Sequence, residues 1–405
     1  MSHKHRHHYD IDPYLWVVFL TAFASTMPGL ILGISHAEIP PQLGAFLFGV
    51  AIFGAAFILS WASEAAEIDI SKSLAVAILA LIAVLPEYAV DFVFTWKAGQ
   101  ELPNAHDNAI ANMTGANRLL VGLGWPVVLL IYSWAKRKKE IILDESQRVE
   151  IFYLAMATLY SFTIPLKGSL NLLDTVVLVI LFGLYIRRAS QVESPEPDFV
   201  GPVKILANMR DLPRRMVTAS LFLFSGAVIF FVAEPFADSL VNTGRAYNIN
   251  EFFLVQWLAP IASEAPEFIV ACTWAFRGTA GSALKALISS KVNQWTLLVG
   301  TLPLVYAISS GYVRPFVLSD NQDHELWLTA AQSIYAVAVL VNLRFGRVEA
   351  WILFVLFLFQ LIFSQTHIYV TYVYLALAFV AHIVHRKSLI PALRVGLGLK
   401  HGAGE

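Results

Sequence analysis

The sequence predicts an all-α, polytopic membrane protein with about 12 transmembrane helices, and two observations lead to this prediction. Of its 405 residues, 57% are hydrophobic and 14% are charged, whereas a soluble domain carries charge on roughly a quarter of its residues. The apolar residues gather in runs close to the ~20 residues that a helix needs to cross a bilayer. Cys272 is the only cysteine, so neither an intramolecular disulfide nor a thiolate metal site is expected.

The apolar runs form two groups of five, with one extra helix at each end of the chain. The extra helices are expected at 14–35 and 367–385. A cleaved signal peptide is the alternative for the first, but its apolar run exceeds the roughly 7–15 residues of such a leader. The two groups are 43–63, 72–96, 105–135 (long, or broken near Gly115), 149–164 and 169–187, then 215–240, 251–276, 281–310, 324–343 and 348–364.

These spans divide the chain into five regions. A polar linker separates the two groups, and it is too charged to enter lipid. The predicted regions are an N-terminal tail and extra helix at 1–42, a first repeat at 43–187, a cytoplasmic linker at 188–213, a second repeat at 214–364, and an extra helix and cytoplasmic tail at 365–405.

The positions of the basic residues predict the orientation, because Lys and Arg are enriched in cytoplasmic loops. With the N-terminus inside, 22 of the 28 Lys and Arg fall on the cytoplasmic side, 4 fall outside, and Arg118 and Lys291 remain within spans. Both termini are therefore expected in the cytoplasm. Since each repeat has an odd number of helices, the second repeat is expected to be inverted relative to the first.

The two repeats share an unusual motif. Leu-Pro-Glu-Tyr-Ala-Val occupies 85–90 and Ala-Pro-Glu-Phe-Ile-Val occupies 265–270, so Glu87 and Glu267 lie 180 positions apart. Leu-Leu-Val-Gly follows each motif, at 119–122 and at 297–300. A proline beside a carboxylate is costly at membrane depth, and paired interrupted segments of this kind point to the substrate site of a transporter.

Each motif helix places two acids on one face. Glu87 and Asp91 are spaced i, i+4, and Glu264 and Glu267 are spaced i, i+3. An intramembrane carboxylate costs several kcal/mol, so it faces a cavity, pairs with a cation or takes up a proton. Together with the carbonyls that the prolines release, these oxygens are the ligands that hard cations prefer. The alternative is that the acids are structural and neutralised by neighbours, but two symmetry-related pairs make this less favoured.

The next helix in each half supplies polar side chains. Asn112 and Asn117 lie in the first repeat, and Ser290 and Asn293 in the second, with Asn117 and Asn293 as the matched pair. These amides and hydroxyls either bond between helices or coordinate an ion, and the sequence leaves both roles open.

These residues resemble the sodium/calcium exchanger family of the cation:cation antiporter superfamily. Each of its two repeats pairs a (Ser/Thr)-Leu-Pro-Glu-Leu helix with a Gly-Asn-x-x-Gly-Ser-Asn helix. Residues 85–88 and 265–268 match the first motif, whereas 112–117 matches the second in part and 292–293 keeps a remnant. The resemblance implies ten core helices in two inverted repeats, and cation sites at the membrane midplane with Glu87 and Glu267 as central metal ligands.

The chain departs from the family pattern in two ways. The hydroxyl pair before Leu-Pro-Glu is replaced by Ala83-Val84 in the first repeat and by Ser263-Glu264 in the second. Arg118 and Lys291 also lie in the helices expected to line the cavity, where a tethered cation can pair with the acids and take the place of a transported ion. Their alternative is to extend along the helix toward the membrane surface.

The sequence therefore predicts a secondary active antiporter that exchanges Ca²⁺ or another cation for Na⁺ or H⁺ by alternating access at midplane carboxylates. The alternatives are exchange coupled to protons alone, and a non-transporting relative or sensor whose sites Arg118 and Lys291 plug. An enzyme is not expected, since no Gly-x-Ser-x-Gly elbow or nucleotide-binding glycine loop is present. The expected partners are inorganic cations and the lipid bilayer of a cell or plasma membrane, with no nucleic acid and no cofactor besides the transported Na⁺, Ca²⁺ or H⁺.

Overall fold

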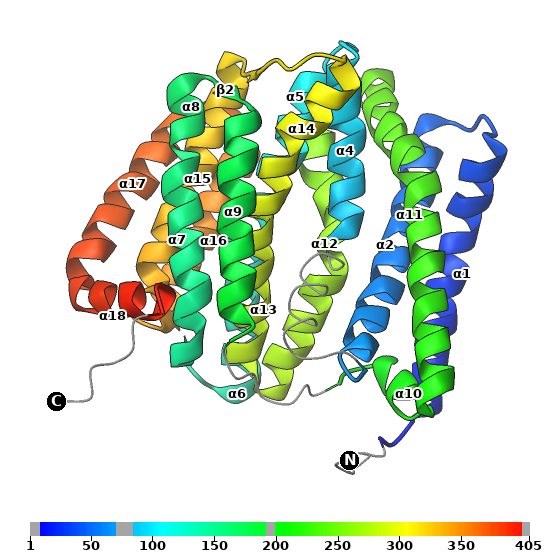
Figure 1. The fold of residues 1–405 in the computed structure, drawn as a ribbon, viewed down its shortest axis with the longest axis horizontal. Coiled ribbons are helices and arrows are strands. Elements are labelled where there is room, and N and C mark those ends of the chain that lie inside the picture. The colour runs from blue at the N-terminus through cyan, green and yellow to red at the C-terminus, as the bar shows by residue number, and fades with distance from the viewer. Residues whose placement is uncertain (1–8, 70–83, 192–198, 399–405) are drawn as a thin grey trace.

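The computed structural model describes residues 9–69, 84–191 and 199–398, and these residues form a bundle of packed helices (Figure 1). The start of helix α1 and the whole of helix α18 lie on the same side of the bundle, toward the bottom of the view (Figure 1).

The elements of the first half precede the long helix α11. They are α1 (Pro13–Ser35), α2 (Pro41–Ala66), α4 (Leu85–Gly99), α5 (Ala105–Leu119), η1 (Leu120–Gly124), α6 (Trp125–Lys136), β1 (Glu140–Ile142), η2 (Glu145–Gln147), α7 (Arg148–Ser161), α8 (Thr163–Lys167), β2 (Ser169–Leu170), α9 (Leu172–Ala189) and α10 (Val203–Ala207).

The second half begins with α11. Its elements are α11 (Asp211–Tyr247), α12 (Glu251–Arg277), α13 (Ala280–Asn293), η3 (Gln294–Leu298), α14 (Val299–Ser310), β3 (Phe316–Val317), α15 (Asp320–Leu340), β4 (Arg344–Gly346), α16 (Arg347–Ile362), η4 (Ser364–Thr366), α17 (His367–Val384) and α18 (Arg386–Gly396).

The helices lie where the hydropathy of the sequence predicts spans, mostly within a few residues at each end; α11 differs most, since it ends at Tyr247 and the predicted span ends at 240. The beginning of the predicted span 72–96 lies outside the described residues, as do part of the linker and parts of both tails. Six of the described helices are long and apolar enough to cross a membrane. The structure thus agrees with a multi-pass membrane protein, and the count of about 12 spans stays a prediction.

The predicted long span at 105–135 is one helix over Ala105–Lys136, so the break considered near Gly115 does not occur. Its middle widens into a π-helical segment, η1, and the corresponding run of the second half contains another, η3. Such wide turns change which side chains face the bundle interior, and they are frequent at functional sites.

The short strands connect the two halves of the chain. Strand β1, after α6, pairs antiparallel with β4, before α16, with Ile141 opposite Phe345. Strand β2, before α9, pairs in the same way with β3, after α14, with Leu170 opposite Phe316. Each strand pair thus joins the two halves of the chain. One strand follows α6 or α14, the end of the second motif helix of its half, and its partner lies in a loop of the other half.

The helices that follow β2 and β3 begin in the same manner. Asn171 caps α9 and Ser319 caps α15, each in a capping box that Asp174 or Gln322 completes. These reciprocal bonds satisfy backbone donors that would otherwise be unpaired at the helix start, which explains why both spans begin where they do.

Four packed helices position the acidic residues of the two motifs. Helix α12 packs against α5, α13 and α4, and α4 also packs against α5. The first motif is on α4 and the second is on α12, so the contact between these helices brings the two halves of the sequence together.

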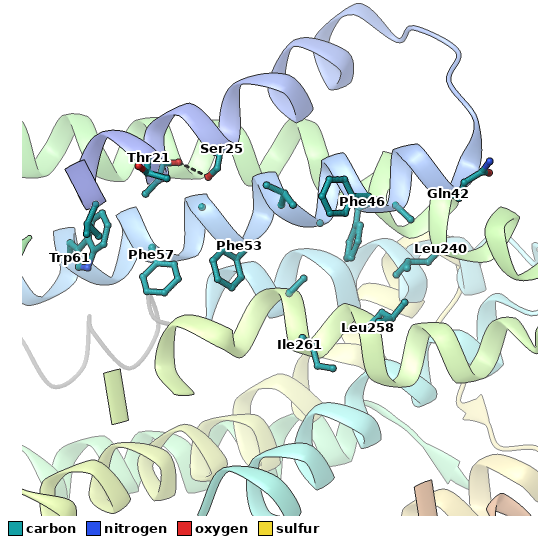
Figure 2. Close-up of a pocket in the computed structure, with 18 of the residues that line it drawn as sticks. Thr21, Ser25, Gln42, Phe46, Phe53, Phe57, Trp61, Leu240, Leu258 and Ile261 are labelled. Carbon is teal, nitrogen blue, oxygen red and sulfur yellow. Dashed lines mark hydrogen bonds between the residues drawn. The ribbon is translucent and has the colours of Figure 1, made fainter. Parts of the chain in front are cut away.

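A large apolar groove lies elsewhere, between α1, α2, α11 and α12 (Figure 2). It has a volume of about 810 Å³, and aromatic side chains such as Phe46, Phe53 and Phe57 line it. None of the four predicted acids is among the described residues that line the groove. Its described lining residues are mostly apolar and lack the carboxylate oxygens that a cation site needs.

Asp69, just beyond the end of α2, connects this helix to α11 through hydrogen bonds. Its carboxylate accepts hydrogen bonds of 2.8 Å from Nε and Nη2 of Arg214 and from Nε of Arg215. The hydrogen bond from Arg214 is the main reason why the pKa of Asp69 lies below its ordinary value. The stabilisation is therefore present above the ordinary aspartate pKa and is lost as the pH falls below it.

We expect Asp69→Asn to lower the free energy of unfolding at neutral pH by about 1–2 kcal/mol, the low range for charged hydrogen bonds because Arg215 is exposed. The matched control is Asp211→Asn, because Asp211 has an exposed side chain and only one 3.2 Å contact with Arg214, which should matter less. Thermal unfolding in detergent, followed from neutral to acidic pH, measures both. Equal destabilisation by the two variants would contradict this account.

Candidate cation-binding site

Glu87 of α4 and Glu264 of α12 meet at one amide group. Nε2 of Gln294 donates to Oε2 of Glu87 at 3.0 Å and to Oε1 of Glu264 at 2.6 Å. All three side chains are buried, with Gln294 fully inaccessible. The motif helices thus bring an acid from each half of the sequence into one polar cluster.

Several oxygen atoms of this cluster have no hydrogen-bond donor. Asp91 accepts a 2.7 Å bond from Nδ2 of Asn112 through Oδ1 only. Among the buried oxygens without a partner are Oε1 of Glu87, Oδ2 of Asp91, Oδ1 of Asn112 and Oε2 of Glu264. Buried carboxylate oxygens need a proton or a cation, and carboxylate and amide oxygens are the ligands that Ca²⁺ prefers.

Glu267 lies one helical turn beyond Glu264 and is only partly buried. It is close enough to act electrostatically on both Glu87 and Glu264, and Ser290 of α13 lies beside it. The structure therefore keeps Glu267 near the cluster, while Glu264 shares the donor with Glu87.

Among the described residues, no three or more His, Cys, Asp or Glu side chains are arranged closely enough to hold a metal ion by themselves. Any ion bound here would need further oxygens from amides, hydroxyls or water. Asn112 and Gln294 provide such oxygens, since Oε1 of Gln294 is also buried without a partner.

Lys291 is buried beside the cluster and does not extend toward the membrane surface. Its Nζ donates to the backbone oxygen of Asn117 at 3.1 Å and to Oδ1 of the same residue at 2.7 Å. The ammonium group also lies 4.7 Å from the ring centroid of Trp295. The nearest acids that act on its charge are Glu264 and Glu87, so Lys291 supplies a fixed positive charge at the edge of the cluster.

Arg118 has a different environment from the one that the sequence suggests. Its guanidinium forms an ion pair with Glu325 of α15 and lies 5.3 Å from the ring centroid of Trp257. The structure therefore places Arg118 in an ion pair of its own, and the positive charge beside the four acids belongs to Lys291.

The matched pair Asn117 and Asn293 has two different sets of contacts. Asn117 binds Lys291, and its Nδ2 donates to the carbonyl of Met113 at 2.9 Å. Asn293 accepts a 2.9 Å hydrogen bond from the hydroxyl of Tyr88 on α4. Both asparagines are buried and join helices around the cluster.

Sequence reasoning did not select Gln294 and Tyr88 as site residues. Each follows directly on a selected residue, Gln294 after Asn293 and Tyr88 after Glu87. The signal was therefore present in the motif, but only the three-dimensional arrangement shows that Gln294 contacts both acids.

The sodium/calcium exchanger protein family matches the sequence twice, over residues 42–190 and 217–365. The chain belongs to this family. Members of the family are transporters, which agrees with the expectation that the chain is not an enzyme. A search of curated proteins found no match.

Solved structures of exchangers share the fold. The crystal structure of the H⁺/Ca²⁺ exchanger CAX is 41% identical, has a TM-score of 0.92, and the match covers 96% of this chain and 98% of that one. Native YfkE is 15% identical, with a TM-score of 0.65 and coverage of 84% and 98%. The sodium-calcium exchanger NCX_Mj is 19% identical, with a TM-score of 0.52 and coverage of 82% and 98%. The last two likenesses show the fold alone.

Membership in an exchanger family makes this chain an integral, multi-pass membrane protein of a cation-exchanger type. It does not favour the alternative of a non-transporting relative plugged by Arg118 and Lys291, and the pairing of Arg118 with Glu325 also weighs against that alternative.

Proposed function

We propose that this exchanger is a Ca²⁺/H⁺ antiporter in which Glu87 and Glu264 alternately bind a Ca²⁺ ion and protons. The observation that carries the proposal is the pair of buried carboxylates that share the single amide of Gln294, each with one oxygen unpartnered. Asp91, Asn112 and Glu267 complete the oxygen set. The 41% identical protein whose structure is described as an H⁺/Ca²⁺ exchanger supports the choice of ions.

The chemistry of the carboxylate pair suggests how the ions compete. Two ionised carboxylates that approach one amide repel each other, and burial removes the water that would screen this repulsion. A divalent cation between them removes the repulsion, and so does protonation of the pair. Binding of one ion therefore releases the other, which is the requirement for exchange.

Lys291 limits the charge that the site can take up. Four acids and one lysine give a formal charge of −3 if every group is ionised, and protons shared among the closely spaced acids bring it nearer to −2. The site then suits one divalent ion per cycle. This is consistent with a smaller ion load than that of an exchanger whose site has no resident ammonium group.

The arrangement of the chain supports alternating access between two inverted repeats of five helices. The loop strands support it, since β1 and β3 follow corresponding helices and pair with β4 and β2 of the opposite halves. In this proposal the domains keep the boundaries given above, and both termini lie in the cytoplasm.

Flux in proteoliposomes tests the proposal. We expect an imposed pH gradient to drive ⁴⁵Ca²⁺ uptake without Na⁺, and a Na⁺ gradient at equal pH to drive little. The Na⁺-coupled exchanger is the second candidate, because the family includes it and the oxygen ligands also suit Na⁺. Uptake that requires Na⁺ and ignores the pH gradient would contradict H⁺ exchange in favour of that candidate.

A further inference from the structure

A second buried polar cluster lies apart from the acidic residues of the proposed site. It consists of Arg118 on α5, Glu325 on α15 and His367 at the start of α17, with Gln256 of α12 beside them. Arg118 is fully buried and Glu325 is 4% exposed. A charged cluster of this kind is costly inside a membrane protein, and none of the contacts of the proposed cation site explains it.

Glu325 is the centre of this cluster. Its Oε2 forms the ion pair with Nη2 of Arg118 and accepts a 2.9 Å hydrogen bond from Nε2 of Gln256. Its Oε1 lies 2.9 Å from Nδ1 of His367. One carboxylate therefore connects four helices, and two of them, α5 and α12, carry residues of the proposed cation site.

The position of Arg118 and Gln256 explains why the cluster can affect that site. Arg118 directly follows Asn117, which holds Lys291, and Gln256 lies eight residues before Glu264 on α12. Helices α5 and α12 are in close contact here, since a Cβ atom on Gly115 would lie 1.9 Å from the carbonyl oxygen of Gln256. A shift of either helix at this crossing would move Asn112, Asn117 or Glu264.

Both ring nitrogens of His367 contact an oxygen atom of another helix. Its Nδ1 faces the carboxylate of Glu325, and its Nε2 lies 3.0 Å from the backbone carbonyl oxygen of Gln360 on α16. The carbonyl only accepts hydrogen bonds, and so does the carboxylate, which is ionised in its pair with Arg118; the two contacts are therefore satisfied together only when both ring nitrogens carry hydrogen. The neutral ring leaves one of these contacts as two facing lone pairs.

The surroundings of His367 contain few other charges. On α15, the ionisable group that faces His367 is Glu325, which in turn pairs with Arg118 of α5. On α17 itself, the side chain of Tyr374 is buried two helical turns after His367. Helix α16 presents a carbonyl, and its own charged residues, Arg347 and Glu349, lie at the opposite end. His367 follows the exposed residues 362–365 and begins α17, which runs from there toward α18 on the side where α1 begins, so this exposed turn lies at the other end of α17 (Figure 1).

We propose that Arg118, Glu325 and His367 are positioning residues that hold α5 and α12 in register for cation binding, and that protonation of His367 makes this support depend on the pH at the end of the bundle opposite the start of α1. The effect on transport rests on the proposed function. The double protonation of the His367 ring is independent of that function, because it follows from the two hydrogen-bond acceptors alone.

The test compares two His367 variants of the full-length protein with a histidine control. His367→Gln keeps one donor and no charge, whereas His367→Arg keeps donors and a permanent charge. His324→Gln is the control, because this histidine directly precedes Glu325 on α15 but its side chain is exposed. Calcium KM and kcat are measured in proteoliposomes between roughly pH 5 and 8, the range in which histidine changes its charge.

We expect His367→Gln to raise the KM for Ca²⁺ about threefold to tenfold at acidic pH, with a smaller change in kcat, because the helices lose register without losing a ligand; this corresponds to about 0.7–1.4 kcal/mol. His367→Arg should keep the low KM and lose part of its pH dependence, and His324→Gln should match the wild type. Identical pH profiles for wild type and both His367 variants, or equal effects of Gln and Arg, would overturn the proposal.

A spectroscopic measurement separates this inference from the proposed function. In protein with ¹⁵N-labelled histidine, the signal that His367→Gln removes should show two protonated ring nitrogens at about pH 6. A single neutral tautomer at that pH would overturn the inference even if Ca²⁺ is transported. A doubly protonated ring in a protein without Ca²⁺ flux would support the cluster geometry and contradict the proposed function instead.

Discussion

Glu264→Gln should reduce Ca²⁺ transport by about 100-fold, the largest effect that we expect from a single substitution, equal to about 2.7 kcal/mol. The glutamine keeps the size of the side chain but loses the charge that attracts the cation and the ability to take up a proton. It also offers Gln294 a second amide in place of a carboxylate. Glu87→Gln should have the same effect, because the two acids share one donor.

The matched control for this prediction is Glu267→Gln. Glu267 is only partly buried and is not bonded to Gln294, so we expect its substitution to reduce transport several-fold less. Ca²⁺ uptake in proteoliposomes, with the amount of folded protein checked by size-exclusion chromatography, measures all three variants. If Glu267→Gln were inactive and Glu264→Gln active, the central pair would be Glu87 and Glu267, as the symmetry of the motifs suggests.

Gly115→Ala should severely destabilise the protein. The added methyl group would lie 1.9 Å from the carbonyl oxygen of Gln256, and a backbone atom in a packed helix cannot move away as a flexible side chain can. Overpacking of this kind costs ~1–3 kcal/mol and occasionally more, and we expect the upper part of that range. The helices would separate at the crossing that carries both polar clusters, so transport should also fall.

Gly226→Ala on α11 is the control for this effect. Nothing lies within 4 Å of a Cβ atom added there. Alanine is a better helix former than glycine by about 0.5–1 kcal/mol, so this variant should be as stable as the wild type or slightly more so. Thermal unfolding in detergent compares the two variants. A Gly115→Ala protein as stable as Gly226→Ala would show that α5 and α12 are not in the close contact described.

The two polar clusters divide the intramembrane charges of this exchanger between two roles. Lys291 stays beside the acids of the proposed site, whereas Arg118 is neutralised by Glu325. Arg118 and Lys291 look equivalent in the sequence, since each lies in the second motif helix of its half. They differ because each meets a different partner on another helix: Arg118 contacts Glu325 on α15, and Lys291 contacts Asn117 on α5.

The sequence by itself determined the class of protein, the positions of the helices and the family. These properties depend on local features: apolar runs of sufficient length, the paired Pro-Glu motifs and the glycine and asparagine residues near them. The motif also selected Glu87, Asp91, Asn112 and Glu264, which the structure brings into one cluster.

Only the tertiary structure decided which of these residues meet. Gln294 joins Glu87 to Glu264 across 207 and 30 positions of sequence, and Arg118 finds Glu325 on a helix that no motif marks. Such pairings depend on the rotation of each helix about its axis and on where two helices cross. Those are fixed by close packing at points such as Gly115 and Gln256, which hydropathy and motif spacing do not encode.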